Sequence, residues 1–337
     1  MNVTELAAEL GVSPSTVSRV LRGNAAKYRI SKATVERVEE AAKRHQVTPD
    51  PIGSGLQSGR TGMVGLLVPD ITNPFFAGLA RSLELSFREE GMTVQLGDSA
   101  EDPVTEWEVL RQMINRRLDG LVVAPVGRNS PEFVEVVNEA KMPIIMVDRV
   151  IPELGFPMVG LDNAEAGRMA VEHLVEMGHR EIGFLRGGND SFTDRERMRG
   201  AAEAMGDAKL QMKTEFVSGS GYTRAESFDA ALQLLSRPKR PSAIVALSGQ
   251  GTLGILEAVN ELGISIPADL SMVAFDEQPW SAFVSPPLTT ISQPVEDLGR
   301  IAKDLMWRLI NGQPLGKMGE FRKAELRPRN SVRRVDV

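Results

Sequence analysis

Short hydroxyl side chains and arginines gather in the segment SPSTVSRVLRG, which runs from Ser13 to Gly23. Small hydroxyl residues let a backbone come close to a phosphate, and an arginine fork can donate two hydrogen bonds to the edge of a guanine. The polar side chains that stay outside the apolar stripe of this segment are Ser15, Thr16, Ser18, Arg19 and Arg22. These groups predict a surface that contacts a polyanion.

Charge is unevenly distributed along the 337 residues. Residues 1–60 hold nine Lys or Arg and six Asp or Glu, a formal charge of +3, whereas the remainder carries −9 and the whole chain −6. Charges farther away than a Debye length of about 8–10 Å are largely screened. The acidic body therefore does not prevent the basic head from binding nucleic acid.

Composition excludes several classes of protein. Hydrophobic residues at 42% and charged residues at 25% are typical of a soluble globular chain, and the length predicts two or three folding units. We find no apolar run long enough for a membrane span and no signal-peptide pattern, so we expect a cytoplasmic protein. Cysteine is absent and there are only three histidines, so we expect no catalytic residues, no metal and no cofactor.

Three short helices must hold the polar segment in place. We expect Thr4 to cap the first helix, Ser13 with Pro14 to begin the second, and Ser31 to cap the third. Two helices joined by so short a turn are typical of the helix-turn-helix, whose second helix enters the major groove. The alternative is a generic three-helix domain with a solvated polar face.

The segment Val47–Gly62 is rich in Pro and Gly and is predicted to be a linker, and beyond it β-rich runs alternate with amphipathic helical segments. The runs are MVGLLVPD, TVQLGDS, GLVVAP and PIIMVDR, followed after about residue 160 by EIGFLRGG, SAIVALS and SMVAFD. Such alternation predicts parallel sheets covered on both faces, and two sets predict two Rossmann-like lobes. Ligands of open α/β sheets bind beyond the carboxyl ends of the strands, so facing lobes would enclose a common cleft.

Polar side chains stand at the predicted strand ends, among them Asp70, Asp148, Arg149, Ser248 and Asp276. Carboxylates accept hydrogen bonds from paired hydroxyls, arginine donates to hydroxyl or ring oxygens, and aromatic rings stack on the apolar faces of sugars. This chemistry suits a polar, multiply hydroxylated small molecule. Taken singly, each residue has an alternative interpretation as a helix cap or a surface ion pair.

The head resembles the LacI/GalR family of bacterial repressors, whose heads read T-x-x-x-[IVL]-A-x-x-[AL]-G-V-S-x-x-T-V-S-R-V-L. The match runs nearly unbroken from Leu6 to Leu21, and the resemblance extends over nearly the entire chain. It implies a small all-α helix-turn-helix head and an α/β body of two lobes, similar to type I periplasmic binding proteins. By the family pattern, base-reading positions fall on Pro14, Ser15 and Arg19, and phosphate-contacting positions on Ser13, Thr16 and Ser18.

The loop NAAKYR after Gly23 is three residues longer than the common family form and resembles the fructose and sucrose repressor subgroup. Lys27, Tyr28 and Arg29 either add phosphate contacts there or form an ordinary solvated loop. In the family, the linker becomes a short hinge helix on operator DNA, and the leucine that matches Leu56 enters the minor groove. A permanently flexible tether is the alternative interpretation of this segment.

The resemblance also implies ligand contacts in both lobes. The matching positions are Phe75, Phe76, Asp148 and Arg149 in the first lobe and Thr193, Arg197, Tyr222 and Asp276 in the second. Ser248 and Gly249 replace an Asn-Asp pair that is usual in the family, which leaves the ligand class open. Arg186, Arg195 and Arg197 keep a phosphorylated sugar as an alternative to a neutral one.

These observations predict a transcriptional regulator, a repressor that binds a palindromic operator as a homodimer and responds to a sugar or sugar phosphate between its lobes. The expected limits are 1–46 for the head and 47–62 for the hinge. The first lobe would comprise 63–160 plus about 291–320, and the second 161–290 plus about 321–337. A sugar-processing enzyme or a solute-binding receptor with the same cleft remains the alternative.

Overall fold

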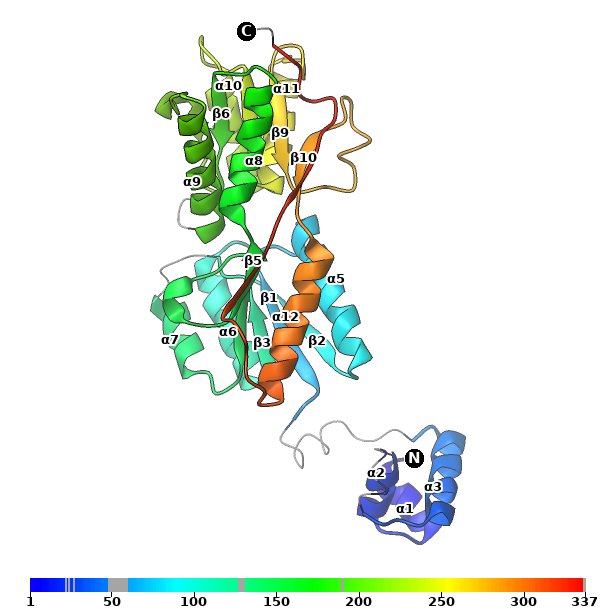
Figure 1. Ribbon diagram of the computed structural model, residues 1–337. Helices are drawn as coiled ribbons and strands as arrows, with labels where there is room; N and C mark the ends of the chain where they lie inside the picture. Colours follow the sequence, from blue (N-terminus) through cyan, green and yellow to red (C-terminus); the bar gives the residue numbers. More distant parts are fainter. Residues whose placement is uncertain are drawn as a thin grey trace. The chain divides into compact units, whose positions relative to one another are not determined.

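The computed structural model describes residues 1–21, 23, 25, 26, 28–47, 60–126, 131–188 and 191–335. The chain divides into two compact units, Met1–Gly62 and Met63–Val337 (Figure 1). Among the described residues, no helix has the length and apolar character that a membrane crossing requires.

The first unit is a bundle of three helices: α1 Val3–Leu10, α2 Pro14–Leu21 and α3 Lys32–His45. Leu6 of α1, Val17 and Val20 of α2 and Val38 of α3 form its buried centre, each 2% exposed or less. Helices α1 and α2, with the short turn that connects them, form the helix-turn-helix that the sequence predicts. Gly11, at φ +66°, ends α1 in a left-handed conformation and makes this tight turn accessible without strain.

Two of the three residues predicted to cap these helices do so in the structure. Ser13 Oγ accepts a hydrogen bond from the Thr16 backbone N–H at 3.1 Å, and Ser31 Oγ begins α3 in the same way. The prediction of Thr4 as the first cap was wrong. Asn2 caps α1 instead, because its side chain and that of Glu5 bond each other's backbone N–H groups in a capping box.

The second unit contains two six-stranded sheets, one for each predicted lobe. The first sheet has the order β11-β5-β4-β3-β1-β2, and the second has the order β12-β10-β9-β8-β6-β7. Strands of the first sheet are β1 Met63–Val68, β2 Thr93–Asp98, β3 Gly120–Val123, β4 Ile144–Val147, β5 Met158–Leu161 and β11 Gly319–Arg322. Strands of the second are β6 Ile182–Leu185, β7 Val217–Ser218, β8 Ala243–Ala246, β9 Ser271–Phe275, β10 Thr289–Ser292 and β12 Glu325–Arg327.

Every strand pair is parallel, as predicted, except that β12 lies antiparallel to β10. The sequence pattern did not predict five short strands: β5, β7, β10, β11 and β12. They are two to four residues long, and β11 and β12, with the sequences GEFR and ELR, lack the apolar run that marks a buried strand.

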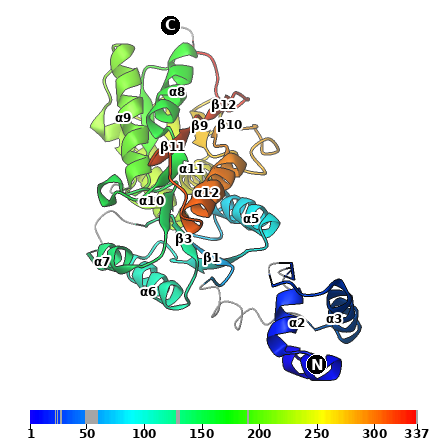
Figure 2. The ribbon, with the colours of Figure 1, turned by 60° about the horizontal axis from the view of Figure 1, so that its bottom comes forward.

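Helices cover both faces of each sheet (Figures 1 and 2). The first lobe carries α5 Pro74–Glu89, α6 Pro103–Asn115, α7 Pro131–Glu139 and α12 Val295–Ile310, with the 3-10 turn η1 Pro152–Leu154. The second carries α8 Asn163–Glu176, α9 Phe192–Asp207, α10 Arg224–Leu235 and α11 Gly249–Glu261, with the 3-10 turn η2 Thr214–Phe216.

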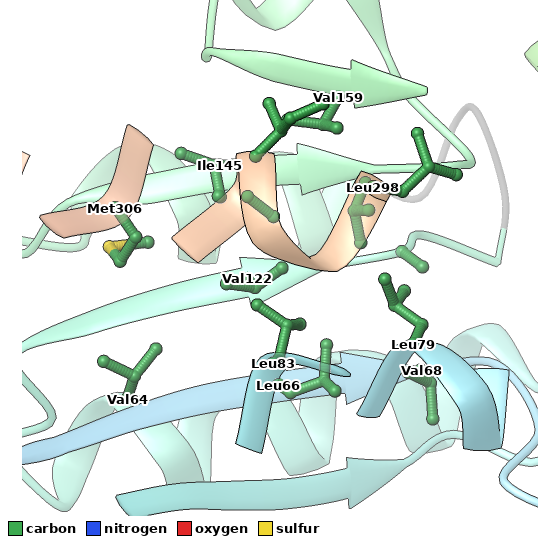
Figure 3. Packing of buried hydrophobic residues seen from close by; sticks show 14 of the residues in the cluster. Val64, Leu66, Val68, Leu79, Leu83, Val122, Ile145, Val159, Leu298 and Met306 are labelled. Atoms are coloured by element: carbon green, nitrogen blue, oxygen red, sulfur yellow. The ribbon is translucent and has the colours of Figure 1, made fainter. Parts of the chain in front are cut away.

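The core of the first lobe explains why its strands are continuous apolar runs. Leu79 and Leu83 of α5 and Leu298 and Met306 of α12 lie over one face of the sheet, against side chains such as Val122 (Figure 3). A second cluster, under α6 and α7, covers the other face. In a strand that is buried on both faces, successive side chains are all apolar, and polar and apolar residues do not alternate along the sequence.

The chain crosses between the two sheets three times. The crossings follow β5, which ends at Leu161, β10, which ends at Ser292, and β11, which ends at Arg322. In Figure 1 the third crossing is the thin C-terminal segment that runs from the first sheet to the second. The expected limits of the lobes differ from these strand ends by one or two residues.

Candidate nucleic-acid and ligand sites

The polar residues predicted on α2 lie on the outer side of this helix. Ser13, Pro14, Ser15 and Arg19 are exposed and Thr16 and Ser18 partly exposed, whereas Val17 and Val20 face the core of the head. The hydroxyls of Ser15 and Thr16 each lie 2.8 Å from Ser13 Oγ. This arrangement presents short hydroxyl groups at the start of α2 and one arginine in its last turn, outside the core of the head. Contact with a DNA backbone and a base edge requires such groups.

Tyr28 holds Arg19 in place from the long loop that precedes α3. The guanidinium carbon of Arg19 lies 4.0 Å from the centre of the Tyr28 ring. Arg29, next in the loop, is exposed and has a left-handed backbone at φ +53°. The other candidates in this region, Arg22, Lys27 and Leu56, lie outside the described residues.

We expect Tyr28→Leu to lower operator affinity about twofold to fivefold, because an exposed cation–π contact contributes about 0.5–1 kcal/mol. The ring would restrict Arg19 before binding, so its loss adds conformational freedom that DNA must remove. Fluorescence anisotropy on a selected operator measures the change. Tyr28→Phe is the matched control, since it keeps the ring. Equal losses in both variants would assign the effect to the hydroxyl instead.

In the body, one small cavity of about 30 Å³ is lined by side chains from the strand ends of both lobes. Nine of the ten predicted ligand residues line it: Phe75, Phe76, Asp148, Arg149, Thr193, Arg197, Tyr222, Ser248 and Asp276. The tenth, Asp70, lies beside it and accepts hydrogen bonds from Thr72 and, across the cleft, from Gln250 Nε2 at 3.3 Å.

Three further lining residues were missed: Asn73, Gln250 and Gln293. Gly249, which the sequence analysis names only for its departure from the family pattern, also lines the cavity. Gln293 follows β10, a strand that the sequence pattern did not reveal. Asn73 has a detectable local signal, because its side chain caps α5 just before Pro74. Gly249 and Gln250 begin α11, directly after the predicted Ser248.

Two aspartates that follow equivalent strands have left-handed backbones, with φ +61° at Asp148 after β4 and +69° at Asp276 after β9. Asp276 accepts hydrogen bonds from the Gly249 backbone N–H at 3.1 Å and from Gln293 Nε2 at 2.6 Å. A Cβ at Gly249 would lie 3.0 Å from the Asp276 carboxylate and 2.7 Å from Gln278 Nε2. The glycine that departs from the family pattern thus lets this carboxylate reach the start of α11.

Of the two acids that line the cavity, Asp148 is the one with incomplete hydrogen bonding. Its side chain is buried, and its Oδ1 has no hydrogen-bond partner among the described residues. Burial raises the pKa of Asp148 to about 6, against the opposing effect of Arg197 and Arg149. A buried oxygen of this kind favours a ligand that donates a hydrogen bond.

Arg149 and Tyr222 meet across the cleft. The guanidinium carbon of Arg149 lies 3.9 Å from the centre of the Tyr222 ring, and the Tyr222 hydroxyl is hydrogen-bonded to Ser191. The ring also lies so close to Gly187 and Gly188 that a Cβ at either would come within 2.8 Å of it. These contacts account for the small volume of the cavity, about 30 Å³.

Arg197 lines the cavity and connects α9 with the start of α8 and with the segment after β8. Its Nε donates to Asn163 Oδ1 at 2.9 Å and its Nη1 to the Leu247 carbonyl at 2.7 Å, while the guanidinium stacks on Phe275. Arg186 instead forms two hydrogen bonds with Asp194 and does not line the cavity. Arg195 also lies outside the lining.

A larger groove of about 560 Å³ adjoins the cleft between the starts of α5 and α12. It shares Phe75, Asp276 and Gln293 with the cavity.

In the part of the chain that the structure describes, no group of three or more His, Asp or Glu side chains could hold a metal ion. His179 is buried between Ser242 and the Arg333 carbonyl, and burial lowers its pKa.

Two family descriptions match this sequence: "Bacterial regulatory proteins, lacI family" over residues 2–50 and "Periplasmic binding protein-like domain" over residues 171–332. The HTH-type transcriptional repressor CytR of Escherichia coli (strain K12) is 31% identical over 330 residues, which cover 98% of this chain and 95% of CytR. The chain belongs to the LacI family of bacterial regulatory proteins.

Solved structures agree with this assignment. The complex of the transcriptional regulator CelR with cellobiose is 27% identical, has a TM-score of 0.74 and covers 98% of this chain and 99% of CelR. The lac repressor dimer bound to operator and the anti-inducer ONPF shares the fold, with a TM-score of 0.86, 23% identity and 99% of each chain covered. The predicted fold class is therefore confirmed.

As a LacI-family member, the chain is a DNA-binding transcriptional regulator, which confirms the function expected from the head motif. Members of the family are regulators and not enzymes. The side chains assigned to DNA and ligand remain predictions. The geometry places those from Ser13 to Arg19 on the outer side of α2 and nine of the ten ligand residues around one cavity.

Proposed function

We propose that this protein represses transcription as a homodimer on a palindromic operator, and that a sugar-like effector between its lobes changes its operator affinity. The observation that carries the proposal is the convergence of nine predicted side chains, from the strand ends of both sheets, on one interlobe cavity. CytR is named a transcriptional repressor, and CelR binds cellobiose.

Exposed apolar side chains support a dimer. Leu85 of α5, Leu96 of the edge strand β2 and Phe283 in the loop after β9 are 44%, 43% and 86% exposed. In Figures 1 and 2, α5 and the loop between β9 and β10 lie on the same side of the body. Exposed apolar groups shared by both lobes favour an interface with a second copy. Two-fold symmetry would then match two heads to two operator half-sites.

The coupling would act through the first lobe, whose strand β1 begins directly after the linker. A ligand that changes the angle between the lobes moves the first lobe relative to its partner copy, and so changes the spacing of the two linkers. An effector shifts operator affinity only if it binds the two arrangements unequally. A coupling free energy of about 1–3 kcal/mol corresponds to about a 5- to 150-fold change.

The test begins with selection of bound duplexes from a random DNA pool at moderate salt. Operator titrations with and without sugars and sugar phosphates then show whether any compound changes the affinity. The proposal predicts a preferred palindromic sequence and at least one effector. A chain that prefers no duplex over bulk competitor DNA, with every compound tested, would contradict it.

Asp276→Ala should abolish the effector response and leave operator affinity without effector within about twofold of the original. The carboxylate joins the start of α11 to Gln293 at the second crossing, so its loss uncouples the ligand from the interlobe connection. The matched control is Asp229→Ala, which removes an exposed carboxylate on α10 and should keep the response. A full response in Asp276→Ala would remove this residue from the site.

A further inference from the structure

We propose that the cleft selects an uncharged polyhydroxylated ligand over its phosphorylated form, and that Glu101 sets this preference by engaging Arg149. The inference rests on the proposed function, because it concerns the effector of the same site. No sequence motif singled out Glu101. It acts through another side chain and is therefore a positioning residue.

Arg149, the arginine of the lining best placed to bind a phosphate, already forms an ion pair with Glu101. Arg149 Nη1 and Nη2 donate to the two carboxylate oxygens of Glu101 at 2.7 and 2.6 Å, and the side chains are only 5% and 13% exposed. This bidentate geometry is the one in which arginine binds a phosphate most strongly. Phe76 and Tyr222 lie near the guanidinium as well, at 5.6 and 3.9 Å. An anionic ligand would have to displace Glu101 from this pair.

The second arginine of the lining, Arg197, is also engaged by Asn163 and the Leu247 carbonyl. Three carboxylates, of Asp148, Asp276 and Glu101, stand around these two guanidinium groups. These side chains therefore carry no excess positive charge that could neutralise a phosphate dianion. Taking such an ion from water without a matching charge is costly.

The acceptors without partners indicate the ligand's hydrogen-bonding character. Within the cavity lining, Asp148 Oδ1 and Gln293 Oε1 are buried and have no hydrogen-bond partner among the described residues. The orientation of the Gln293 amide follows from its Nε2, which faces the carboxylate of Asp276. Both groups accept hydrogen bonds. A hydroxyl can donate to them, whereas a phosphate dianion can only accept.

Backbone geometry fixes Glu101 in its position. Ala100 and Glu101 have left-handed backbones, at φ +52° and +56°, in the turn between β2 and α6. The Glu101 N–H donates to the Pro69 carbonyl at 2.7 Å, which ties this turn to the end of β1. The backbone therefore directs the Glu101 side chain at Arg149.

Thermal denaturation of the full-length chain tests the inference with matched probes: D-ribose and ribose 5-phosphate, D-glucose and glucose 6-phosphate, and inorganic phosphate against chloride at equal ionic strength. In the wild type, a neutral sugar should raise Tm more than its phosphate ester does, and inorganic phosphate should match chloride. Glu101→Gln should acquire a saturable rise of about 2–8 °C with inorganic phosphate, because Arg149 is released.

Two variants control for charge and for site. Glu84→Gln removes the same charge from an exposed ion pair on α5 and should gain nothing with phosphate. The double variant Glu101→Gln/Arg149→Gln should lose the gain that Glu101→Gln shows.

The inference is overturned if wild-type protein is stabilised more by a phosphate ester than by its parent sugar, or if folded Glu101→Gln gains nothing with phosphate. The wild-type comparison stands even if the variant does not fold. If no neutral sugar binds but Glu101→Gln gains phosphate binding as expected, the control of anion binding by Glu101 holds, whereas the selection of an uncharged polyhydroxylated ligand fails together with the proposed sugar-like effector.

Discussion

Arg19→Ala should bind the selected operator about 5- to 150-fold more weakly and should lose base preference at one position of each half-site. A bidentate arginine contact to a guanine discriminates by about 1–3 kcal/mol, and a phosphate contact carries no such preference. Arg19 is exposed on the outer face of α2, between the buried Val17 and Val20 and next to Ser18. It is the one arginine of this helix, and Tyr28 already holds it in place.

A panel of operators with single base changes, titrated by fluorescence anisotropy, measures both effects. Arg44→Ala is the matched control, because it removes an exposed arginine from α3 that is paired with Glu40 at 3.4 Å. It should weaken binding to all duplexes slightly and equally. If Arg19→Ala behaved in the same way across the panel, the residue would contact phosphate and not a base edge.

Gly200→Ala should cost about 3 kcal/mol or more of the body's stability and lower its Tm by about 6–12 °C. Helices α8 and α9 lie side by side in both views (Figures 1 and 2) and approach closely at two glycines. A Cβ at Gly200 would lie 1.8 Å from the Ala164 carbonyl oxygen, and one at Gly167 would lie 2.0 Å from that of Arg197. Backbone atoms cannot rotate away, so the helices would have to separate.

Gly206→Ala, in the last turn of the same helix, is the control. A Cβ there meets no atom within 4 Å, so alanine should raise Tm slightly through its helix propensity of about 0.5–1 kcal/mol over glycine. Circular dichroism on heating measures both variants. Separation of α8 from α9 would also displace Arg197 and Asn163, so Gly200→Ala should weaken effector binding. A wild-type Tm in Gly200→Ala would show that the helices are not in such close contact.

The sequence by itself determined the elements that depend on neighbours along the chain. The helix-turn-helix follows from caps and apolar residues within a few positions of one another, such as Ser13 with Thr16. The prediction of Thr4 as the first cap was wrong, because Asn2 caps that helix. The apolar strands β1, β3, β4, β6, β8 and β9 were predicted for the same reason. The strand-end rule also placed Asp148 and Asp276 correctly beside one cavity.

Tertiary structure decided what depends on residues far apart in the sequence. Strands β11 and β12 are polar and short, and they exist only because β5 and β10 supply the backbone partners for them. Glu101 pairs with a residue 48 positions away. Gln293 lies in PPLTTISQP, which resembles the family's second crossing between the lobes, but no local pattern indicated that its side chain would reach Asp276. Whether a buried arginine is available to a ligand depends on such distant partners, because a guanidinium in low dielectric must be compensated by whatever charge the fold brings to it.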